Sequence, residues 1–206
     1  MFAEFYNQDN RYTAIRYKGK NKKWEYFNEN GGSLEKAFLR APLDFVYVSS
    51  HFNPNRRHPI LNTIRAHNGV DYAAKRGTPI RATGGGVVQS IGWKSGYGRT
   101  IVIRHGGEIT TLYAHLNAYH SSISKGIKVS QGQTIGYVGD SGLATAPHLH
   151  YEFRIGKKRT DPLKVALPSA APLDQSKMAP FKVLRNNYIE ISDQLLSKDP
   201  NEKLFQ

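Results

Sequence analysis

Apolar and aromatic residues between about Val46 and Lys164 recur in short runs that are separated by glycine-containing turns. Runs of this length, rich in β-branched and aromatic residues, are typical of strands. The clear ones are Ile80–Val88, Thr100–Arg104, Thr110–His115, Thr134–Val138 and His148–Ile155. No helical periodicity extends beyond two turns in this part of the chain, so the pattern predicts a mostly β domain.

The segment His148–Ile155 has the most regular alternation. Its odd-numbered positions are apolar or aromatic, and its even-numbered positions, from His148 to Arg154, are polar. Successive side chains of a strand point to opposite faces of the sheet. We therefore expect the imidazoles of His148 and His150 to lie side by side on one polar face.

The residues before this domain predict a hairpin and a short helix. Arg11–Tyr17 and Trp24–Phe27 are β-rich segments on either side of the turn sequence GKNKK. Ser33–Arg40 fits a short helix that begins at a serine N-cap and ends before Pro42.

The residues after Leu167 predict a tether and a terminal helix. Three prolines, the last of them Pro180, favour an extended segment at the start of residues 168–206. Three apolar residues of Asn187–Lys198 share one helical face, which predicts an amphipathic helix packed on the β domain. The β domain itself is assigned to residues 46–167.

Composition and charge narrow the classes of function. The 206 residues include 29 Lys and Arg against 16 Asp and Glu, a net charge of +13, with no cysteine. Such a surface attracts nucleic acid, anionic lipid or an acidic cell-wall polymer. The lack of cysteine excludes disulfides and cysteine metal sites, and no apolar stretch is long enough for a transmembrane helix. The acidic N-terminus is not a signal peptide, so we expect an exported protein of this sequence to have lost its leader.

Histidine and aspartate residues are spaced for a metal site. In an extended chain His67, Gly69 and Asp71 share a face, and the glycine leaves a gap between an imidazole and a carboxylate. These are zinc-ligand types, and one of His148 and His150 would complete a three-ligand set with an open position for water. The other histidine of that pair, together with His115, would supply a general base and an oxyanion stabiliser.

Three sequence blocks together resemble one family. They are AHNGVDYAAKRGTPIRAT (Ala66–Thr83), YAHL (Tyr113–Leu116) and GQTIGYVGDSGLATAPHLHYEF (Gly132–Phe153). The order H-x-x-x-D, Y-x-H-L, glycine-rich loop and H-x-H is similar to that of the lysostaphin/LytM-type zinc metallopeptidases, over about Ser49 to Pro168. The entry segment Ser49–Ile60 further resembles the Gram-negative murein D,D-endopeptidases of this family.

The resemblance implies both a site and a fold. It assigns His67, Asp71 and His150 to one Zn²⁺ per chain, and His115 and His148 to catalysis. The implied fold is a twisted antiparallel sheet lining an open groove, the LytM-type duplicated hybrid motif, with short peripheral helices. Related enzymes carry additional N-terminal domains, so residues 1–45 are interpreted as the remnant of an upstream region that could inhibit the enzyme.

The function implied is a zinc-dependent endopeptidase that cuts peptidoglycan stem-peptide cross-links in the periplasm or cell envelope. The expected bond joins D-alanine to meso-diaminopimelate, and a glycyl-glycine bond is the alternative. A non-catalytic LytM-type module that activates an amidase is disfavoured because all five site residues are intact. Nucleic-acid binding is disfavoured because neither a stacking motif nor a helix-turn-helix pattern is present.

Other histidines and one glycine loop receive structural interpretations. His105 lies at a hairpin turn and is expected to pack, and His120 is expected to be exposed. His51 and His58 flank a loop near the expected groove entrance and are candidates for substrate contact. Gly139–Gly142 (GDSG) is interpreted as a tight turn and not as the nucleophile loop of a serine protease.

Overall fold

The computed structural model describes the 206 residues except 8–9, 20–22, 46, 57–65 and 199–206. The chain forms two compact units. One consists of Met1–Ala37 together with Pro168–Gln206, and the other of Phe38–Leu167. The two ends of the chain therefore belong to the same unit, a grouping that the linear reading of the sequence did not anticipate.

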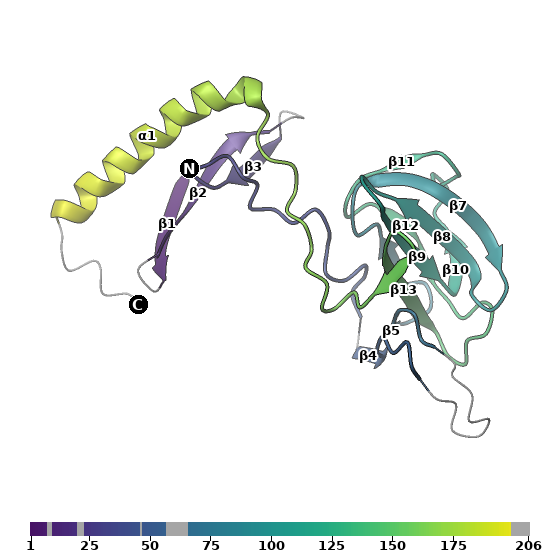
Figure 1. The fold of residues 1–206 in the computed structure, drawn as a ribbon. Helices are drawn as coiled ribbons and strands as arrows, with labels where there is room; N and C mark the ends of the chain where they lie inside the picture. The colour runs from purple at the N-terminus through teal and green to yellow at the C-terminus, as the bar shows by residue number, and fades with distance from the viewer. Residues whose placement is uncertain (8–9, 20–22, 46, 57–65, 199–206) are drawn as a thin grey trace. The chain divides into compact units, whose positions relative to one another are not determined.

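The first unit contains a small antiparallel sheet and one helix (Figure 1). Its elements are β1 (Phe2–Asn7), β2 (Asn10–Lys18), β3 (Trp24–Phe27) and α1 (Gln175–Lys198). The predicted hairpin is present as β2 and β3, and β1 extends it. Four buried side chains from both ends of the chain form the core: Ile15, Phe27, Leu173 and Phe181. This core explains why the terminal helix packs on the N-terminal sheet. The sequence analysis had instead predicted that the helix packs on the β domain.

Helix α1 begins well before the predicted segment and contains Pro180. The prediction of a tether as far as this proline is therefore wrong. Phe181, next to it, is fully buried and packs edge-on against Phe27 and Tyr17 at ring distances of 6.1 and 5.3 Å. This packing stabilises a helix that proline alone would interrupt. No helix among the described residues is both long and apolar enough to cross a membrane.

The helix predicted over Ser33–Arg40 does not form. Its backbone amides bind distant carbonyls: Leu34 N donates to Tyr26 O and Ala37 N to Pro168 O, both at 2.9 Å. In a helix capped by Ser33, Ala37 N would instead donate to Ser33 O. Long-range bridging thus replaces local helical hydrogen bonds, an outcome that local capping signals cannot reveal.

The second unit is built on antiparallel strands (Figure 1). The strands are β4 (Tyr47–Ser50), β5 (Val70–Ala73), β6 (Pro79–Arg81), β7 (Gly86–Lys94), β8 (Gly98–Arg104), β9 (Ile109–Ala114), β10 (Leu116–Tyr119), β11 (Lys128–Val129), β12 (Thr134–Val138), β13 (His148–Ile155) and β14 (Lys158–Thr160). The large sheet has the order β11-β7-β8-β9-β13-β5-β4, with β14 beside β13, and the small one β10-β12-β6. The mostly β, antiparallel fold predicted from the sequence is confirmed. The expected short peripheral helices are not found in the described residues, whose one helix is the long α1.

The segment expected as one strand, Ile80–Val88, is divided between β6 and β7. At the break, the backbone N–H and hydroxyl of Thr83 lie 2.9 and 3.0 Å from the Tyr113 hydroxyl, and the Thr83 hydroxyl also lies 3.0 Å from that of Tyr151. Thr83 is fully buried, so these contacts replace its strand hydrogen bonds. The chain can thereby pass from the small sheet to the large one.

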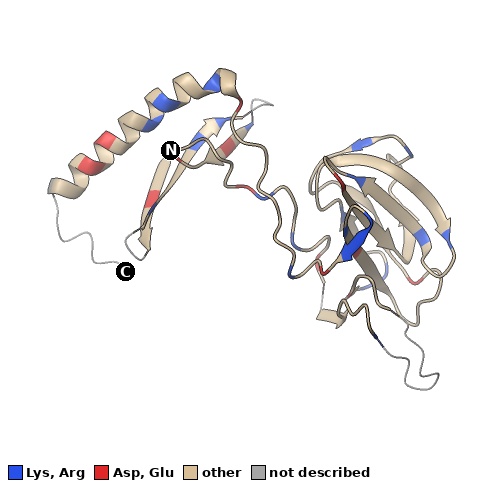
Figure 2. Ribbon diagram, viewed as in Figure 1, with Lys and Arg blue, Asp and Glu red and all other residues tan. Residues whose placement is uncertain are grey.

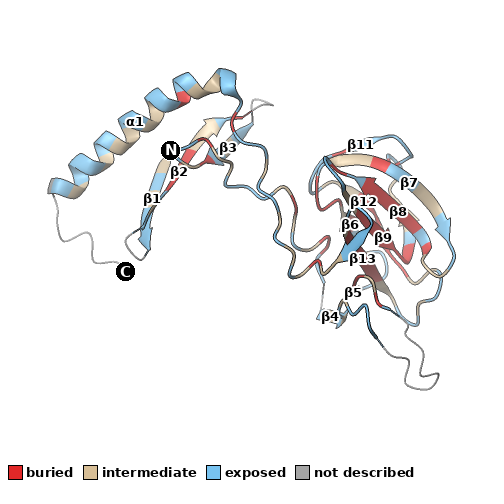
Figure 3. Ribbon diagram, viewed as in Figure 1, coloured by how far each residue is buried: buried red, intermediate tan, exposed pale blue. Residues whose placement is uncertain are grey.

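Most residues of the central strands β8, β9 and β13 are buried (Figure 3). Tyr113, Tyr151 and Phe153 are at most 1% exposed and are among the largest fully buried side chains. Strand β13 is paired with β9 on one side and β5 on the other. A side chain on β13 is therefore held by a rigid, doubly paired backbone.

Candidate active site

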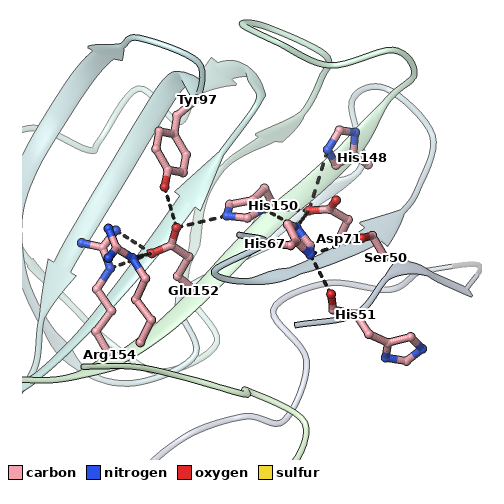
Figure 4. Close-up of polar contacts among 10 residues, drawn as sticks. Ser50, His51, His67, Asp71, Tyr97, His148, His150, Glu152 and Arg154 are labelled. Atoms are coloured by element: carbon pink, nitrogen blue, oxygen red, sulfur yellow. Dashed lines mark hydrogen bonds and ion pairs between the residues drawn. The ribbon is translucent and has the colours of Figure 1, made fainter. Parts of the chain in front are cut away.

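Strand pairing brings the predicted metal ligands together. In the register of β5 with β13, Asp71 lies directly opposite His150, and His67 enters from the segment just before β5 (Figure 4). Asp71 Oδ1 lies 3.0 Å from His67 Nε2 and 2.7 Å from His150 Nδ1, and the two nitrogens are 3.2 Å apart. The structure thus places the three residues of the predicted zinc set at one point, and it selects His150 from the pair of histidines on β13.

Gly69 makes this approach possible. A β-carbon at this position would lie 2.4 Å from the carbonyl oxygen of Tyr151 and 2.8 Å from Cε1 of His150. Real side chains do not tolerate such distances to backbone atoms, so only glycine fits between His67 and Asp71. The gap expected at this glycine is filled by the backbone and ring of the neighbouring strand.

The hydrogen bonds of the two imidazoles fix which nitrogen faces the site. His67 Nδ1 donates to the carbonyl oxygen of His51 at 2.7 Å, which leaves a lone pair on Nε2. His150 Nε2 donates to Glu152 Oε1 at 3.2 Å, which leaves a lone pair on Nδ1. When both rings are neutral, these two nitrogens and the carboxylate of Asp71 are three acceptor atoms that converge with no donor among them. A cation satisfies such a set.

The donor set fits zinc. His67, Asp71 and His150 offer atoms that all lie within 4.8 Å of one another, and the imidazole–carboxylate chemistry is that of zinc sites. Bond lengths of about 2.0–2.2 Å at tetrahedral angles separate ligand atoms by about 3.3–3.6 Å, so the separations of 2.7, 3.0 and 3.2 Å would widen slightly around the ion. Three protein ligands are typical of a catalytic zinc site, in which a fourth position is free for water or substrate.

Asp71 is ionised in this environment. Partial burial alone would raise the pKa of the carboxyl. A proton on the facing nitrogen of His150 or His67 would be hydrogen-bonded and attracted by the carboxylate, and this effect outweighs burial and lowers the pKa of Asp71 below its usual range. The carboxylate is consequently available as an anionic ligand at any pH near neutrality.

Glu152 supports His150 from behind, a role that sequence reasoning missed. Its side chain is fully buried, and its oxygens contact His150 Nε2, the Tyr97 hydroxyl at 2.8 Å, Arg154 Nε at 2.7 Å and Arg159 Nε at 3.3 Å (Figure 4). Burial would raise the pKa of Glu152, but the His150 hydrogen bond and the charge of Arg154 lower it to about 2. The alternation of β13 places Glu152 on the face of His150, but only the structure shows that it is buried and bound.

The two predicted catalytic histidines lie together beside the metal ligands. The rings of His115 and His148 are 4.7 Å apart, and His148 Nε2 is 3.9 Å from Asp71 Oδ1. His115 Nδ1 donates to Ser141 O at 2.7 Å, and His148 Nδ1 donates to Ala146 O at 2.8 Å. Each ring therefore keeps its Nε2 free as a proton acceptor.

His115 occupies an unusual backbone conformation. It follows β9 with a φ of 60°, in the left-handed region that residues other than glycine rarely adopt. Burial is the largest influence on its pKa and lowers it below the ordinary histidine value, although the Ser141 carbonyl acts in the opposite direction. The imidazole is accordingly neutral at pH 7, as a general base requires.

All five predicted site residues line one cavity of about 790 Å³: His67, Asp71, His115, His148 and His150. Tyr97 and Leu143 also border it. The site therefore combines an anionic, three-ligand metal position with the imidazoles of His115 and His148, which face the same space. Hydrolysis of an amide needs this combination of an electrophile and a proton acceptor.

The remaining candidates have structural roles where the structure describes them. His51 contributes its carbonyl to His67, and His58 lies outside the described residues. His105 is buried, with its ring nitrogens bound by Gly85 O and the Thr111 hydroxyl, as expected of a packing residue. His120 is half-buried, where the sequence predicted exposure.

The GDSG loop is a turn, as interpreted from the sequence. The Ser141 hydroxyl donates to Leu116 O at 2.7 Å and accepts from Arg99 N at 2.9 Å. Gly98 meets the backbone of Ser141 so closely that a β-carbon there would lie 2.3 Å away. Ser141 thus fastens the loop that orients His115.

Comparisons with known sequences agree with this site. The model of "Peptidase family M23" matches residues 65–162. "Peptidoglycan DD-endopeptidase ShyC" of Vibrio cholerae is 44% identical over 171 residues, 83% of this chain and 38% of that protein. "DD-carboxypeptidase/endopeptidase Mpg" of Neisseria meningitidis serogroup B is 44% identical over 156 residues, 75% of this chain and 35% of that protein. The chain thus spans little more than a third of the length of these relatives.

Solved structures give the same result. A zinc-containing peptidase from Vibrio cholerae is 32% identical with a TM-score of 0.63, covering 81% of this chain and 50% of that one. A mutant of the catalytic domain of the prophage-encoded M23 protein EnpA from Enterococcus faecalis is 32% identical with a TM-score of 0.50, covering 59% of this chain and 94% of that one.

Proposed function

Because this chain belongs to peptidase family M23, we propose that it is a zinc-dependent endopeptidase that hydrolyses peptide cross-links in peptidoglycan. The observation that carries the proposal is the convergence of three ligand atoms, from His67, Asp71 and His150, beside His115 and His148 in one cavity. The names of the relatives as peptidoglycan DD-endopeptidases support the substrate class.

The residues of the chain would divide the work of hydrolysis. His67, Asp71 and His150 hold the zinc ion, which, when bound, polarises the scissile carbonyl and lowers the pKa of a water molecule. Nε2 of His148 or His115 accepts the proton of the attacking water, since Nδ1 of each ring already donates to a carbonyl. The protonated ring then donates to the oxyanion or to the leaving amine.

The specific bond and the place of action belong to the same proposal. We propose that the bond cleaved joins D-alanine to meso-diaminopimelate of neighbouring stem peptides, which is compatible with relatives named peptidoglycan DD-endopeptidases. A substrate of this kind lies in the cell envelope, and we place the chain in the periplasm. The net charge of +13 supports attraction to a polymer that carries free carboxylates. An inhibitory region upstream of residue 1 remains a prediction.

Chromatography and mass spectrometry of wall digests test the proposal. Gram-negative sacculi are incubated with the zinc-loaded chain and, in parallel, with the chelator-treated chain. We expect cross-linked dimers to become monomeric muropeptides, with intact glycan strands, in the zinc-loaded sample alone.

Two other outcomes would replace the proposal. Cleavage of pentaglycine bridges, with D-alanyl cross-links intact, would assign the glycyl-glycine bond and leave the zinc mechanism in place. Intact cross-links, combined with stimulation of an added amidase, would assign the chain to the non-catalytic activators.

A further inference from the structure

The face of the sheet that carries His150 continues beyond the metal site. Glu152 and Arg154 follow His150 at two-residue intervals on β13 and therefore share its face. Arg154 pairs in register with Thr110 of β9, and Glu152 with the residue next on that face of β9. The same register leads through Val102 of β8 to β7. These strands form one continuous floor that starts at the metal ligands.

A second cavity, of about 400 Å³, lies on this floor. It is lined by residues of five strands and of the turn after β13: Gln89, Ser90, Lys94, Val102, Thr110, Arg154, Gly156, Lys157 and Arg159. Ser90, Val102, Thr110 and Arg154 are on the face of His150, as the register requires. We call this cavity the basic depression, because four of its lining residues are Lys or Arg.

The charge of the basic depression is not balanced by its surroundings. The basic residues of β14 and of the adjoining end of β13 are blue in Figure 2. Arg154 and Arg159 share one carboxylate, Glu152, and among the described residues neither Lys94 nor Lys157 pairs with an acid. Glu108 lies near Gly156, one of the lining residues. Four cationic side chains thus face two carboxylates.

The guanidinium groups are held in place before any ligand arrives. Arg154 Nε and Nη2 lie 2.7 and 2.6 Å from Glu152 Oε2, and Arg159 Nε lies 3.3 Å from the same oxygen. The Arg154 side chain is 20% exposed and that of Arg159 is 42% exposed. A guanidinium has five N–H donors, so each arginine keeps donors for a further anion. Buried Glu152 fixes their positions and thereby lowers the entropy cost of binding.

We propose that the basic depression is an anion subsite that binds a carboxylate of the peptide substrate. This inference rests on the proposed function. Arg154 follows His150 by four positions on β13, a distance of about 13 Å at about 3.3 Å per residue. The subsite therefore binds a carboxylate carried about four peptide residues from the scissile amide. It makes the enzyme select cross-links whose stem peptides have free carboxylates.

A pair of substrates and a pair of variants test the subsite. One substrate is a soluble cross-linked muropeptide dimer, and the other is the same dimer with its carboxylates converted to carboxamides. Lys94→Gln combined with Lys157→Gln removes two cations of the basic depression. Lys125→Gln combined with Lys128→Gln removes two exposed cations that line neither cavity. Zinc content and thermal midpoint are measured for every preparation.

For the wild type and the Lys125/Lys128 variant, we expect the KM for the dimer with free carboxylates to be about threefold or more below the KM for the amidated dimer. Two exposed ion pairs can supply a factor of this size. The Lys94/Lys157 variant is expected to lose that preference. An unchanged preference in this variant, or an equal loss in the Lys125/Lys128 variant, overturns the subsite while the proposed function stands. Failure of the zinc-loaded wild type to cut either dimer instead overturns the proposed function.

Discussion

Each imidazole of the site uses one ring nitrogen to bind the protein and presents the other to the cavity. The acceptors of the four anchoring bonds are His51 O, Glu152 Oε1, Ser141 O and Ala146 O. Three are backbone carbonyls, so the tautomers depend on the fold more than on side-chain identity. The motif could be found in the sequence, where spacing alone left His148 and His150 equivalent and the family resemblance assigned His150 to zinc. Strand register gives the physical reason, because His150 lies opposite Asp71.

Removal of a metal ligand is expected to remove the metal. Replacing His67, Asp71 or His150 by Ala should abolish stoichiometric zinc and activity together, since two ligands are left. Zinc per chain is measured by elemental mass spectrometry after dialysis. Full zinc occupancy in Asp71→Ala would contradict the ligand assignment.

His115→Ala and His148→Ala are the matched comparison. Both are expected to keep zinc and the fold, because neither residue is one of the three ligands. Turnover is expected to fall by about 10²-fold or more. Loss of zinc in either variant would move that residue into the ligand set. Near-normal turnover would show that another group transfers the proton.

Glu152→Gln tests the support behind His150. The amide cannot carry the charge that holds the Nε2 proton of His150, and outer-shell changes of this kind typically weaken metal affinity by about 10–100-fold. Competition with a chromophoric chelator measures the dissociation constant for zinc. Glu108→Gln, which also removes one negative charge, is the control and should bind zinc as the wild type does. Equal affinities in all three proteins would reject the role.

His105 predicts a dependence of stability on pH. Burial lowers the pKa of this imidazole in the folded chain below its ordinary value of about 6.5. As pH falls through about 6.5, the unfolded chain binds a proton that the folded chain excludes, so the free energy of unfolding decreases. His105→Gln should be less stable at pH 7.5, because two buried partners lose their hydrogen bonds, but should depend less on pH. Urea denaturation at pH 7.5 and 5.5 measures both; an equal decrease in the two proteins would exclude His105 as the cause.

At the scale of elements, prediction succeeded where the local pattern and the tertiary structure agree. The expected bounds of β12 and β13 match the structure, since glycine turns and regular alternation define both. It failed where long-range contacts overrule local signals. Backbone N–H groups of the predicted Ser33–Arg40 helix donate to distant carbonyls instead. Helix α1 tolerates Pro180 because Phe181 is buried.

Gly69→Ala tests the approach of β5 to β13. Its methyl group would meet the backbone of Tyr151, so the strands must separate where Asp71 faces His150. We expect weaker zinc binding and a loss of about 1–3 kcal/mol in the free energy of unfolding. Gly106→Ala is the control, because a β-carbon there meets nothing within 4 Å. Equal zinc affinity and thermal midpoint in the two variants would contradict the close approach.

At the scale of the whole molecule, the sequence predicted the β domain and its chemistry but not the grouping of the two chain ends. The contacts between α1 and the strands β2 and β3 join residues that are more than 150 positions apart in the sequence, for example Phe27 and Phe181. Periodicity within a window contains no information on such pairs. By contrast, the site is assembled from motifs with short internal spacing, and only their mutual register had to be supplied by the fold.

A zinc titration of the metal-free chain tests the central claim most directly. Chelator-treated chain receives increasing zinc, and the rate at which a cross-linked muropeptide dimer is converted to monomers is followed by chromatography. The account predicts no cleavage without metal, a linear rise with added zinc, and a break at one zinc per chain. Cleavage that persists in the metal-free chain, or no cleavage at one equivalent, would contradict it.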